Sequence, residues 1–384
     1  MYNFSFQNPT KLIFGEGQIA KIATSIPKDE KVLVIYGGGS IKKNGVYEQV
    51  SAALAEHSWS EFGGIEPNPG FHTCLNALEH IKANGSTFLL AVGGGSVADA
   101  TKFIAGAACF DGDPLTILTE GARVHQALPL GVVLTLPATG SESNPNGVVT
   151  RYETQDKMPF YSRALYPQFA ILDPTVTYSL PNKQVANGIV DAFVHTVEQY
   201  LTFPVGADLQ DRFAEGILRT LIDHGPKALS EPKNYNVRAN VMWSATMALN
   251  GLIGLGVPQD WSTHFIGHEL TALHGMDHAQ TLAVILPAMM AEQREQKREK
   301  LLQYGREVWN LEHGTEDERI ERAIDETRAF FEALGVSTCL EDYGVTETHI
   351  PEIIAALKKH NLTALGEHKD ITPEVSEAVL RRCL

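Results

Sequence analysis

Short apolar runs that end in glycine-rich turns constrain the fold of this chain most. Four of them occur in the first half, at KVLVIYGGGS (31–40), FLLAVGGGS (88–96), LGVVLTLPATGS (130–141) and FAILDP (169–174). Near-continuous apolar strands are typical of parallel sheets, which are buried on both faces. Helical spacing lies between them, at 47–57 and at 72–85, where Gly85 can end the helix. The pattern predicts βαβ organisation and a doubly wound, Rossmann-like α/β domain.

The second half of the chain has a different pattern and offers no further convincing strand. After residue 181 the apolar residues recur at helical spacing, as in 209–225 and 317–335. The charged stretch 292–309 has the same spacing, and we interpret it as the solvated face of a helix. We therefore expect an α/β domain at 1–180 and an all-helical domain at 181–384.

The composition excludes several classes of protein. Hydrophobic residues make up 43% of the 384 residues and charged residues 20%, so the chain can bury a core. The net charge is −15, and no basic stretch would bind nucleic acid or an anionic membrane surface. We find neither a signal peptide nor an apolar stretch long enough to span a bilayer. The four cysteines lie far apart without a CxxC pair, so we expect reduced thiols and a cytoplasmic protein.

The tetrapeptide GGGS follows a predicted strand twice, at 37–40 and at 93–96. Glycine lets backbone N–H groups approach a ligand closely, and a turn that opens a helix presents unpaired N–H groups to a phosphate. Because α/β folds bind ligands where strands meet helices, we interpret both turns as nucleotide-binding; a plain tight turn is the alternative. Neither copy fits the GxGxxG fingerprint.

The first glycine turn indicates which nucleotide is bound. NAD sites often place a carboxylate after the second strand to bind the ribose 2′-OH. The stretch YGGGSIKKNG has no carboxylate, and Ser40, Lys42 and Lys43 would favour a 2′-phosphate, so we predict NADP(H). A third stretch, 136–147, is either an ordinary polar loop or a further part of the cofactor pocket, which would be lined by Thr139, Ser141 and Asn144.

Histidines are concentrated in HFIGHELTALHGMDH, which contains His264, His268, His274 and His278. In a continuous helix the outer two would lie about 21 Å apart, whereas a break at Gly275 can bring them together. Upstream, Asp191 and His195 lie four residues apart and so share one face of a helix; alone, they would be read as an ordinary polar pair. A divalent metal would suit the combined set Asp191, His195, His264 and His278.

The ligand types leave the kind of metal site open. Four protein ligands can form a closed structural zinc site, but such sites usually contain cysteine. The other interpretation is an ion that keeps open positions for a substrate, and imidazole with carboxylate suits Fe²⁺, Zn²⁺ and Mn²⁺ alike. HELTALH does not match HExxH, so the zincin protease motif is absent.

The motifs GGGSVADATK, DAFVH and STHFIGHELTALHGMDHAQ together resemble the iron-containing (group III) alcohol dehydrogenases, in the branch of NADPH-dependent aldehyde reductases and butanol dehydrogenases. The resemblance covers the full chain and implies a dehydroquinate synthase-like fold, with an α/β cofactor domain, a helical metal domain and a dimer. It places the metal ligands at Asp191, His195, His264 and His278, and a histidine near the substrate at His268. It places the cofactor contacts at Gly38, Ser40, Asn68, Gly95, Ser96, Asp99, Thr135, Thr139 and Lys157.

These features predict a metal-dependent NADPH:aldehyde oxidoreductase for short- to medium-chain aldehydes and alcohols such as butanal and butanol. The metal would polarise the carbonyl oxygen, and His268 would supply or relay a proton unless it only supports the site. His274 has no assigned chemistry. A metal hydrolase would use the same Asp/His set without the glycine turns. A dehydroquinate synthase-like lyase would need more basic residues for a phosphorylated substrate.

Overall fold

The computed structural model describes residues 1–384, and these divide into two compact units. The α/β unit contains Gln7–Leu180 and Pro232–Thr246. The helical unit contains Met1–Phe6, Pro181–Glu231 and Met247–Leu384. Two segments therefore belong to a different unit from the one that the sequence pattern suggests, namely the first six residues and the segment 232–246, which includes most of α8 (Tyr235–Ala248).

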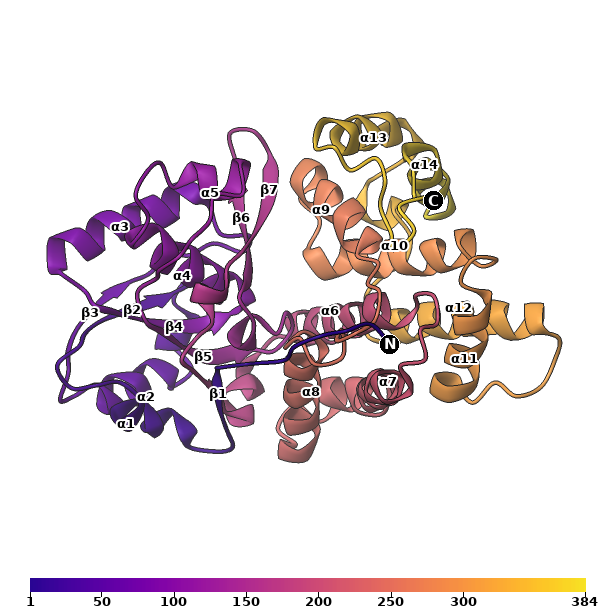
Figure 1. The fold of residues 1–384 in the computed structure, drawn as a ribbon. Coiled ribbons are helices and arrows are strands. Elements are labelled where there is room, and N and C mark those ends of the chain that lie inside the picture. Colours follow the sequence, from indigo (N-terminus) through magenta and orange to yellow (C-terminus); the bar gives the residue numbers. More distant parts are fainter. The chain divides into compact units, whose positions relative to one another are not determined.

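The α/β unit is built on a six-stranded sheet in which every neighbouring pair is parallel, in the order β1-β8-β5-β4-β2-β3 (Figure 1). Its strands are β1 (Lys11–Phe14), β2 (Lys31–Tyr36), β3 (Ser58–Phe62), β4 (Phe88–Gly94), β5 (Leu130–Leu136) and β8 (Phe169–Leu172). The four apolar runs form the four inner strands, as predicted. The edge strands β1 and β3 were not foreseen.

Helices cover both faces of this sheet, because both faces are apolar. Alternate residues of β2 show the division: Leu33 and Ile35 belong to one core, and Val32 and Val34 to the other. The first core also contains residues of α3 (Phe71–Asn84) and α4 (Gly95–Ala108), and the second contains residues of α1 (Ile22–Ser25) and α2 (Val46–Ala53). Figure 1 shows α3 and α4 on one side of the sheet and α1 and α2 on the other. Gly85 ends α3 with a left-handed φ of 63°, as its sequence context predicts.

A separate antiparallel hairpin follows the third apolar run. It pairs β6 (Asn146–Arg151) with β7 (Asp156–Tyr161), and it was not predicted. The short helix α5 (Leu115–Thr119) precedes β5 and packs on β7.

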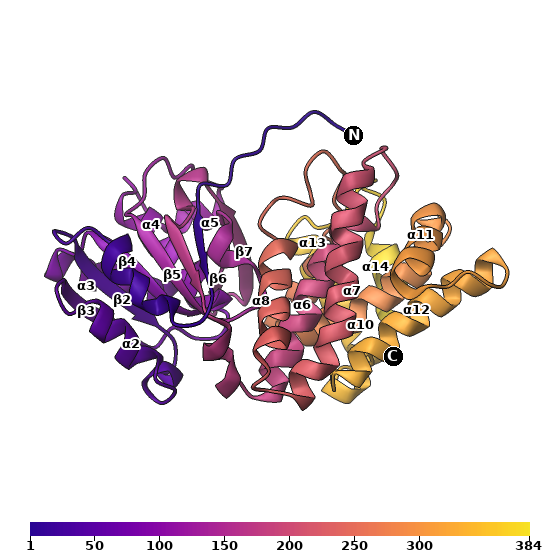
Figure 2. The same cartoon turned by 90° about the horizontal axis from the view of Figure 1, so that it is seen from below.

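The helical unit contains no strand, in agreement with the sequence pattern. Its central helix α6 is buried on nearly every side and packs against α7 and α10 (Figure 2). The helices of the unit are α6 (Asn182–Tyr200), α7 (Asp208–Ser230), α9 (Ser262–His274), α10 (His278–Glu292), α11 (Arg298–Trp309), α12 (Glu316–Ala333), α13 (Ile350–Lys359) and α14 (Pro373–Arg382). The charged stretch 292–309 forms α11 only from Arg298, and its Tyr304 is fully buried, so one face of this helix belongs to the core.

None of the helices combines the length and the apolar content that a membrane crossing requires. All four cysteines are free thiols, and Cys74 and Cys383 are buried.

Candidate metal centre and cofactor site

Helix α6 carries polar side chains at buried positions, where apolar residues are usual. A helix that is buried on all sides normally presents apolar residues all round. Asp191 is 3% exposed and His195 is 4% exposed, and Oδ1 of Asp191 lies 3.4 Å from Nδ1 of His195. Buried polar groups of this kind are costly unless something compensates them. The pair is therefore a candidate for a functional role.

Two further histidines reach the same carboxylate from α9 and α10. Nε2 of His264 lies 3.8 Å from Oδ1 of Asp191, and Nε2 of His278 lies 3.7 Å from the same atom. The chain can bring both together because Gly275 ends α9 with a φ of 67°, after which His278 opens α10. The helix break that the sequence predicts at Gly275 is thus confirmed.

The residues present fit a divalent metal ion. Asp191, His195 and His264 each offer a ligand atom, and these atoms all lie within 4.8 Å of one another. Nδ1 of His195 and Nε2 of His264 are buried and have no hydrogen-bond partner in the protein. Leaving such atoms unsatisfied costs about 1–3 kcal/mol each, and coordination to an ion would remove that cost. One carboxylate with imidazoles is a donor set that Fe²⁺, Zn²⁺ and Mn²⁺ accept.

The surroundings of His195 and His264 shift the pKa values of the two rings in opposite directions. Burial lowers the pKa of His195 to about 4. Burial also opposes the charged form of His264, but the carboxylates of Glu198 and Asp191 outweigh it and raise the pKa of that ring to about 9. Because a metal ligand must be a neutral imidazole, binding of a metal at His264 would release a proton.

Sequence reasoning missed two residues beside this cluster. Glu198 is 3% exposed and its Oε2 forms a short hydrogen bond with Nδ1 of His264. The ring of Trp261 packs edge-on against His264, with centroids 5.4 Å apart, and against His195 at 6.1 Å. Glu198 was open to prediction, because it lies three residues after His195 on the same helix face. The position of Trp261 was not, since it depends on a turn before α9.

The other two histidines of the segment 264–278, His268 and His274, lie in different surroundings in the structure. The ring centroid of His268 lies 5.3 Å from that of His278 and 6.3 Å from that of His264, so His268 borders the candidate metal centre. His274 points elsewhere: its Nε2 lies 3.4 Å from Oε1 of Glu352, and its ring packs against His349.

In the α/β unit, the two glycine turns lie at the switch point of the sheet. The chain leaves β2 for β3 on one side and returns to β4 on the other, so the carboxyl ends of β2 and β4 are neighbours. Ligands of doubly wound folds bind in the crevice at such a point. Gly38 and Ser40 follow β2, and Gly95 and Ser96 open α4, as the sequence predicts.

The two glycine turns differ in how closely other atoms pack around them. A Cβ added at Gly38 would meet no protein atom within 4 Å. A Cβ at Gly95 would lie 2.4 Å from Oγ1 of Thr139, so the first turn of α4 packs tightly against the loop after β5. Thr135 lies within β5 and is 9% exposed. The N-terminus of the 14-residue helix α4 presents its backbone N–H groups and positive dipole end, which favour a phosphate.

Asp99 is held by the protein itself. Its Oδ1 accepts from the Ser141 hydroxyl at 2.5 Å and its Oδ2 accepts from the backbone N–H of Val148 at 2.9 Å. Burial raises the pKa of this carboxyl. The carboxylate therefore joins α4 to the loop and to the hairpin.

The fully buried Lys102 lies one turn after Asp99, with its Nζ 4.0 Å from the carboxylate. Lys102 donates to Oδ1 of Asn144 at 3.2 Å and to the carbonyl of Asn146. Burial lowers its pKa to about 8, although Asp99 and Glu142 act in the opposite direction.

The hairpin brings Asn68 and Lys157 to the same edge of the unit. Thr150 of β6 donates to the carbonyl of Pro69 at 2.8 Å and pairs with Lys157 of β7. Asn68 has a φ of 56°, and its carbonyl accepts from the hydroxyl of Tyr152 at 2.7 Å. Two residues predicted from distant parts of the chain are thus joined through one pair of strands.

Lys42 and Lys43, which follow the first glycine turn, differ in whether a carboxylate lies beside them. Nζ of Lys42 lies 2.8 Å from Oε1 of Glu61 on β3, and the hydrogen bond to Glu61 raises the pKa of this lysine. The sequence did not indicate that a carboxylate from the next strand would partly compensate Lys42. The side chain of Lys43 is exposed.

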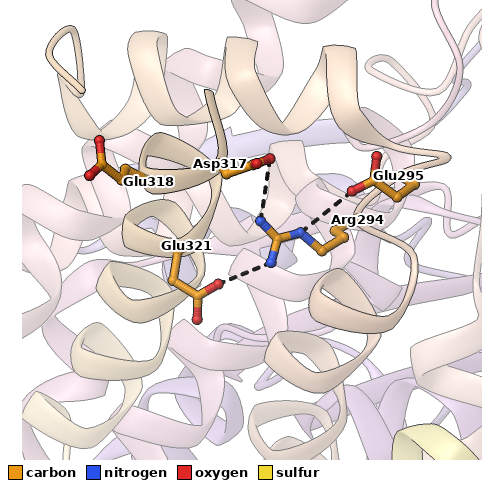
Figure 3. Close-up of a pocket in the computed structure, with 5 residues that line it drawn as sticks. All are labelled: Arg294, Glu295, Asp317, Glu318 and Glu321. Atoms are coloured by element: carbon orange, nitrogen blue, oxygen red, sulfur yellow. Dashed lines mark hydrogen bonds and ion pairs between the residues drawn. The ribbon is translucent and has the colours of Figure 1, made fainter. Parts of the chain in front are cut away.

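A shallow pocket of about 490 Å³ in the helical unit is lined by residues outside the candidate metal set, among them Arg294, Asp317 and Glu321 (Figure 3). Figure 3 shows its Arg294 ion-paired with the surrounding carboxylates, at 3.2 Å from Glu321 and 3.7 Å from Asp317. Because this guanidinium is already compensated, we interpret the pocket as a surface ion-pair network.

Comparison with known proteins agrees with this geometry. Residues 9–174 match the model of the iron-containing alcohol dehydrogenase family, and residues 185–383 match that of the C-terminal region of the same family. The chain is 59% identical to the NADPH-dependent aldehyde reductase YqhD of Escherichia coli, over 99% of both chains. It is 40% identical to the NADP-dependent alcohol dehydrogenase 3 of Entamoeba histolytica, over 97% of this chain and 96% of that one.

Solved structures give the same result. The crystal structure of YqhD superposes with a TM-score of 0.98 at 58% identity, covering 100% of this chain and 99% of that one. The NADH-dependent butanol dehydrogenase A of Thermotoga maritima superposes with a TM-score of 0.95 at 35% identity, with the same coverage. With both halves matched by the family models and with full-length relatives well above 30% identity, the chain belongs to the iron-containing alcohol dehydrogenase family and is an oxidoreductase.

Proposed function

We propose that this protein is a metal-dependent, NADPH-dependent aldehyde reductase that acts on short- to medium-chain aldehydes, such as butanal, and on the corresponding alcohols. The observation that carries the proposal is the 59% identity, over 99% of both chains, to a protein named as an NADPH-dependent aldehyde reductase. The cluster of Asp191 with three imidazoles and the glycine turns at the switch point support it.

The proposed metal ligands are Asp191, His195, His264 and His278. Three helices supply them, so the donor atoms are held by the packed core rather than by a mobile loop. Rigid elements of this kind maintain a site more accurately than loops do. The proposed cofactor contacts are Gly38, Ser40, Asn68, Gly95, Ser96, Asp99, Thr135, Thr139 and Lys157.

When bound, the metal supplies a Lewis acid for the carbonyl oxygen, and NADPH supplies the hydride. The backbone N–H groups of Gly95 and Ser96 would bind a phosphate at the start of α4. Asp99 orients the loop after β5 through Ser141, and Lys157 would lie near the nicotinamide ribose. We propose His268 as the residue that donates or relays the proton, because imidazole titrates near neutral pH and this ring borders the cluster.

The direct test is NADPH oxidation measured with a series of unbranched aldehydes, together with metal analysis of the same sample. We expect aldehyde-dependent oxidation that is lost with the metal and restored by Fe²⁺ or Zn²⁺. No aldehyde-dependent oxidation in a metal-loaded sample would refute the proposal. Hydrolytic activity without nicotinamide would favour a metal hydrolase instead.

The preference for NADPH rests on Lys43 more than on Lys42, which Glu61 partly compensates. Replacing Lys43 with Ala should lower kcat/KM for NADPH and leave that for NADH nearly unchanged. A wild-type enzyme with a higher kcat/KM for NADH would contradict the cofactor assignment.

We further propose a cytoplasmic homodimer with no nucleic-acid or membrane partner. An exposed aromatic series near the N-terminus supports self-association, since Tyr2, Phe4 and Phe6 are each about half exposed. The edge strand β1 pairs only with β8, which leaves its other edge open. Light scattering coupled to size exclusion would give twice the monomer mass, and a monomer at micromolar concentration would contradict the assembly. Cell fractionation tests the location.

A further inference from the structure

Glu198 contacts three parts of the segment Asp260–His264 at once, although it lies outside the proposed metal set. Its backbone carbonyl accepts from the N–H of Asp260 at 2.9 Å. Its side-chain Oε1 accepts from the N–H of Thr263 at 2.7 Å, and its Oε2 bonds to Nδ1 of His264. Glu198 therefore connects α6 to the turn that opens α9.

The contact with Thr263 satisfies a group that the helix cannot satisfy itself. The first N–H groups of an α-helix have no partner within the helix, and an anion near them is favoured by the helix dipole. Helix α9 begins at Ser262, so the N–H of Thr263 is one of these groups. The carboxylate of Glu198 thus acts as a cap that comes from another helix.

The turn itself is strained, so it needs such support. Trp261 has a left-handed backbone with φ 65° and ψ 4°, which a bulky residue adopts only when its surroundings impose it. On the other side of the turn, Asp260 accepts from the N–H of Ser262 at 2.9 Å and from the buried Nζ of Lys297 at 2.7 Å. Glu198 and Lys297 hold the turn from two directions.

The contact between Glu198 and His264 determines which ring nitrogen of His264 is available to a metal. A carboxylate beside Nδ1 keeps the proton on that nitrogen, so Nε2 carries no proton and its lone pair can bind a metal. Nε2 of His264 is the buried atom that has no hydrogen-bond partner and that faces Oδ1 of Asp191 at 3.8 Å.

We infer that Glu198 is the positioning residue for His264: it clamps the strained turn before α9 and fixes the ring so that Nε2 is presented to the metal. This inference rests on the proposed metal centre. It assigns no ligand role to Glu198, because its carboxylate lies at the opposite end of the His264 ring from Nε2.

The test measures metal affinity in metal-free protein, by competition of Zn²⁺ with a chromophoric chelator. Glu198→Gln keeps the shape of the side chain but removes the charge that holds the Nδ1 proton. The expected result is a Kd for Zn²⁺ about 10- to 100-fold weaker, since removal of such partners has effects of this size. Glu198→Asp should recover part of the affinity, because it restores the carboxylate at a shorter reach.

Glu215→Gln is the matched control. Glu215 is also a buried carboxylate of the helical unit and accepts from the Tyr200 hydroxyl at 2.9 Å, but it does not contact the histidines. The Glu215→Gln variant should bind Zn²⁺ with the wild-type Kd. ¹⁵N NMR of the imidazoles should show a proton on Nδ1 of His264 in the metal-free wild type and a larger population without that proton in Glu198→Gln.

His264→Ala distinguishes a failure of the proposed metal centre from a failure of the proposed role of Glu198. Wild-type Zn²⁺ affinity in His264→Ala would overturn the proposed ligand set. Loss of affinity in His264→Ala with wild-type affinity in Glu198→Gln would overturn the positioning role alone. If Glu198→Gln does not fold, the imidazole ¹⁵N spectrum of the metal-free wild type carries the test, and a His264 ring without a proton on Nδ1 would equally refute the role of Glu198.

Discussion

Nδ1 of His195 lies 3.4 Å from Oδ1 of Asp191, one turn away on the same face of α6, in the part of this helix that is buried. Replacing Asp191 with Asn should therefore abolish tight metal binding, because it removes the only carboxylate of the proposed ligand set. We expect less than a tenth of the wild-type metal content and a similar loss of kcat. The exposed Asp223 of α7 provides the control, and Asp223→Asn should retain both. Full metal occupancy in Asp191→Asn would contradict the assignment.

Metal binding should also stabilise the fold, because the proposed ligands come from three helices that meet only in the native state. At a free metal concentration of 100 times Kd, the bound ion would add about 2.7 kcal/mol to the free energy of unfolding. Thermal unfolding of metal-free protein, titrated with Zn²⁺, checks this. A Tm that does not change with metal would mean that the cluster binds none.

Gly95→Ala should impair cofactor binding. The new Cβ would lie 2.4 Å from Oγ1 of Thr139, so either the start of α4 or the loop after β5 must move. We expect KM for NADPH to rise by about tenfold or more, since displacements near 1 Å can cost up to about 100-fold. Gly216→Ala in α7 is the control, because its Cβ would meet no atom within 4 Å. An unchanged KM in Gly95→Ala would show that the crevice tolerates the shift.

Because of the buried Lys102, we expect the free energy of unfolding to rise with pH above about pH 8. Burial lowers its pKa to about 8, whereas an unfolded chain has the ordinary value of 10.5. Between these values the unfolded state binds more protons than the folded state, so the free energy of unfolding rises with pH. The destabilisation caused by Lys102→Met should accordingly grow from pH 8 to pH 10. Urea unfolding at several pH values measures this dependence, and Lys43→Met, at an exposed position, is the control. A destabilisation that shrinks as the pH rises would refute the shift.

Trp261→Gly and Trp261→Ala together isolate the strain of the turn before α9. Both remove the indole, but only glycine accepts a φ of 65° without cost. We expect the Gly variant to be more stable than the Ala variant by about 1 kcal/mol, within the usual range for such strain. Equal stabilities in urea unfolding would indicate that the turn relaxes once the indole is gone.

The inner strands and the main helices were predictable because burial on both faces, or on one stripe, leaves a strong apolar pattern. The edge strands β1 and β3 were not, since an edge strand is only partly buried and SWSEF carries no continuous apolar run. The break at Gly275 could be predicted from one residue type. The partner of Lys42, the clamp by Glu198 and the conformation of Trp261 could not, because each depends on contacts between segments that only the folded chain brings together.

The return of the chain to the α/β unit has a consequence for biosynthesis. Residues 232–246 lie in that unit, where Met242 enters its core and Thr246 bonds to the buried Glu142 at 2.5 Å. During translation the ribosome must therefore release α6, α7 and most of α8 before the α/β unit can close. In a nascent chain stalled at residue 180 the core of the α/β unit should lack Met242, and that core should be completed only in a chain stalled far enough beyond residue 246 for the segment to leave the exit tunnel.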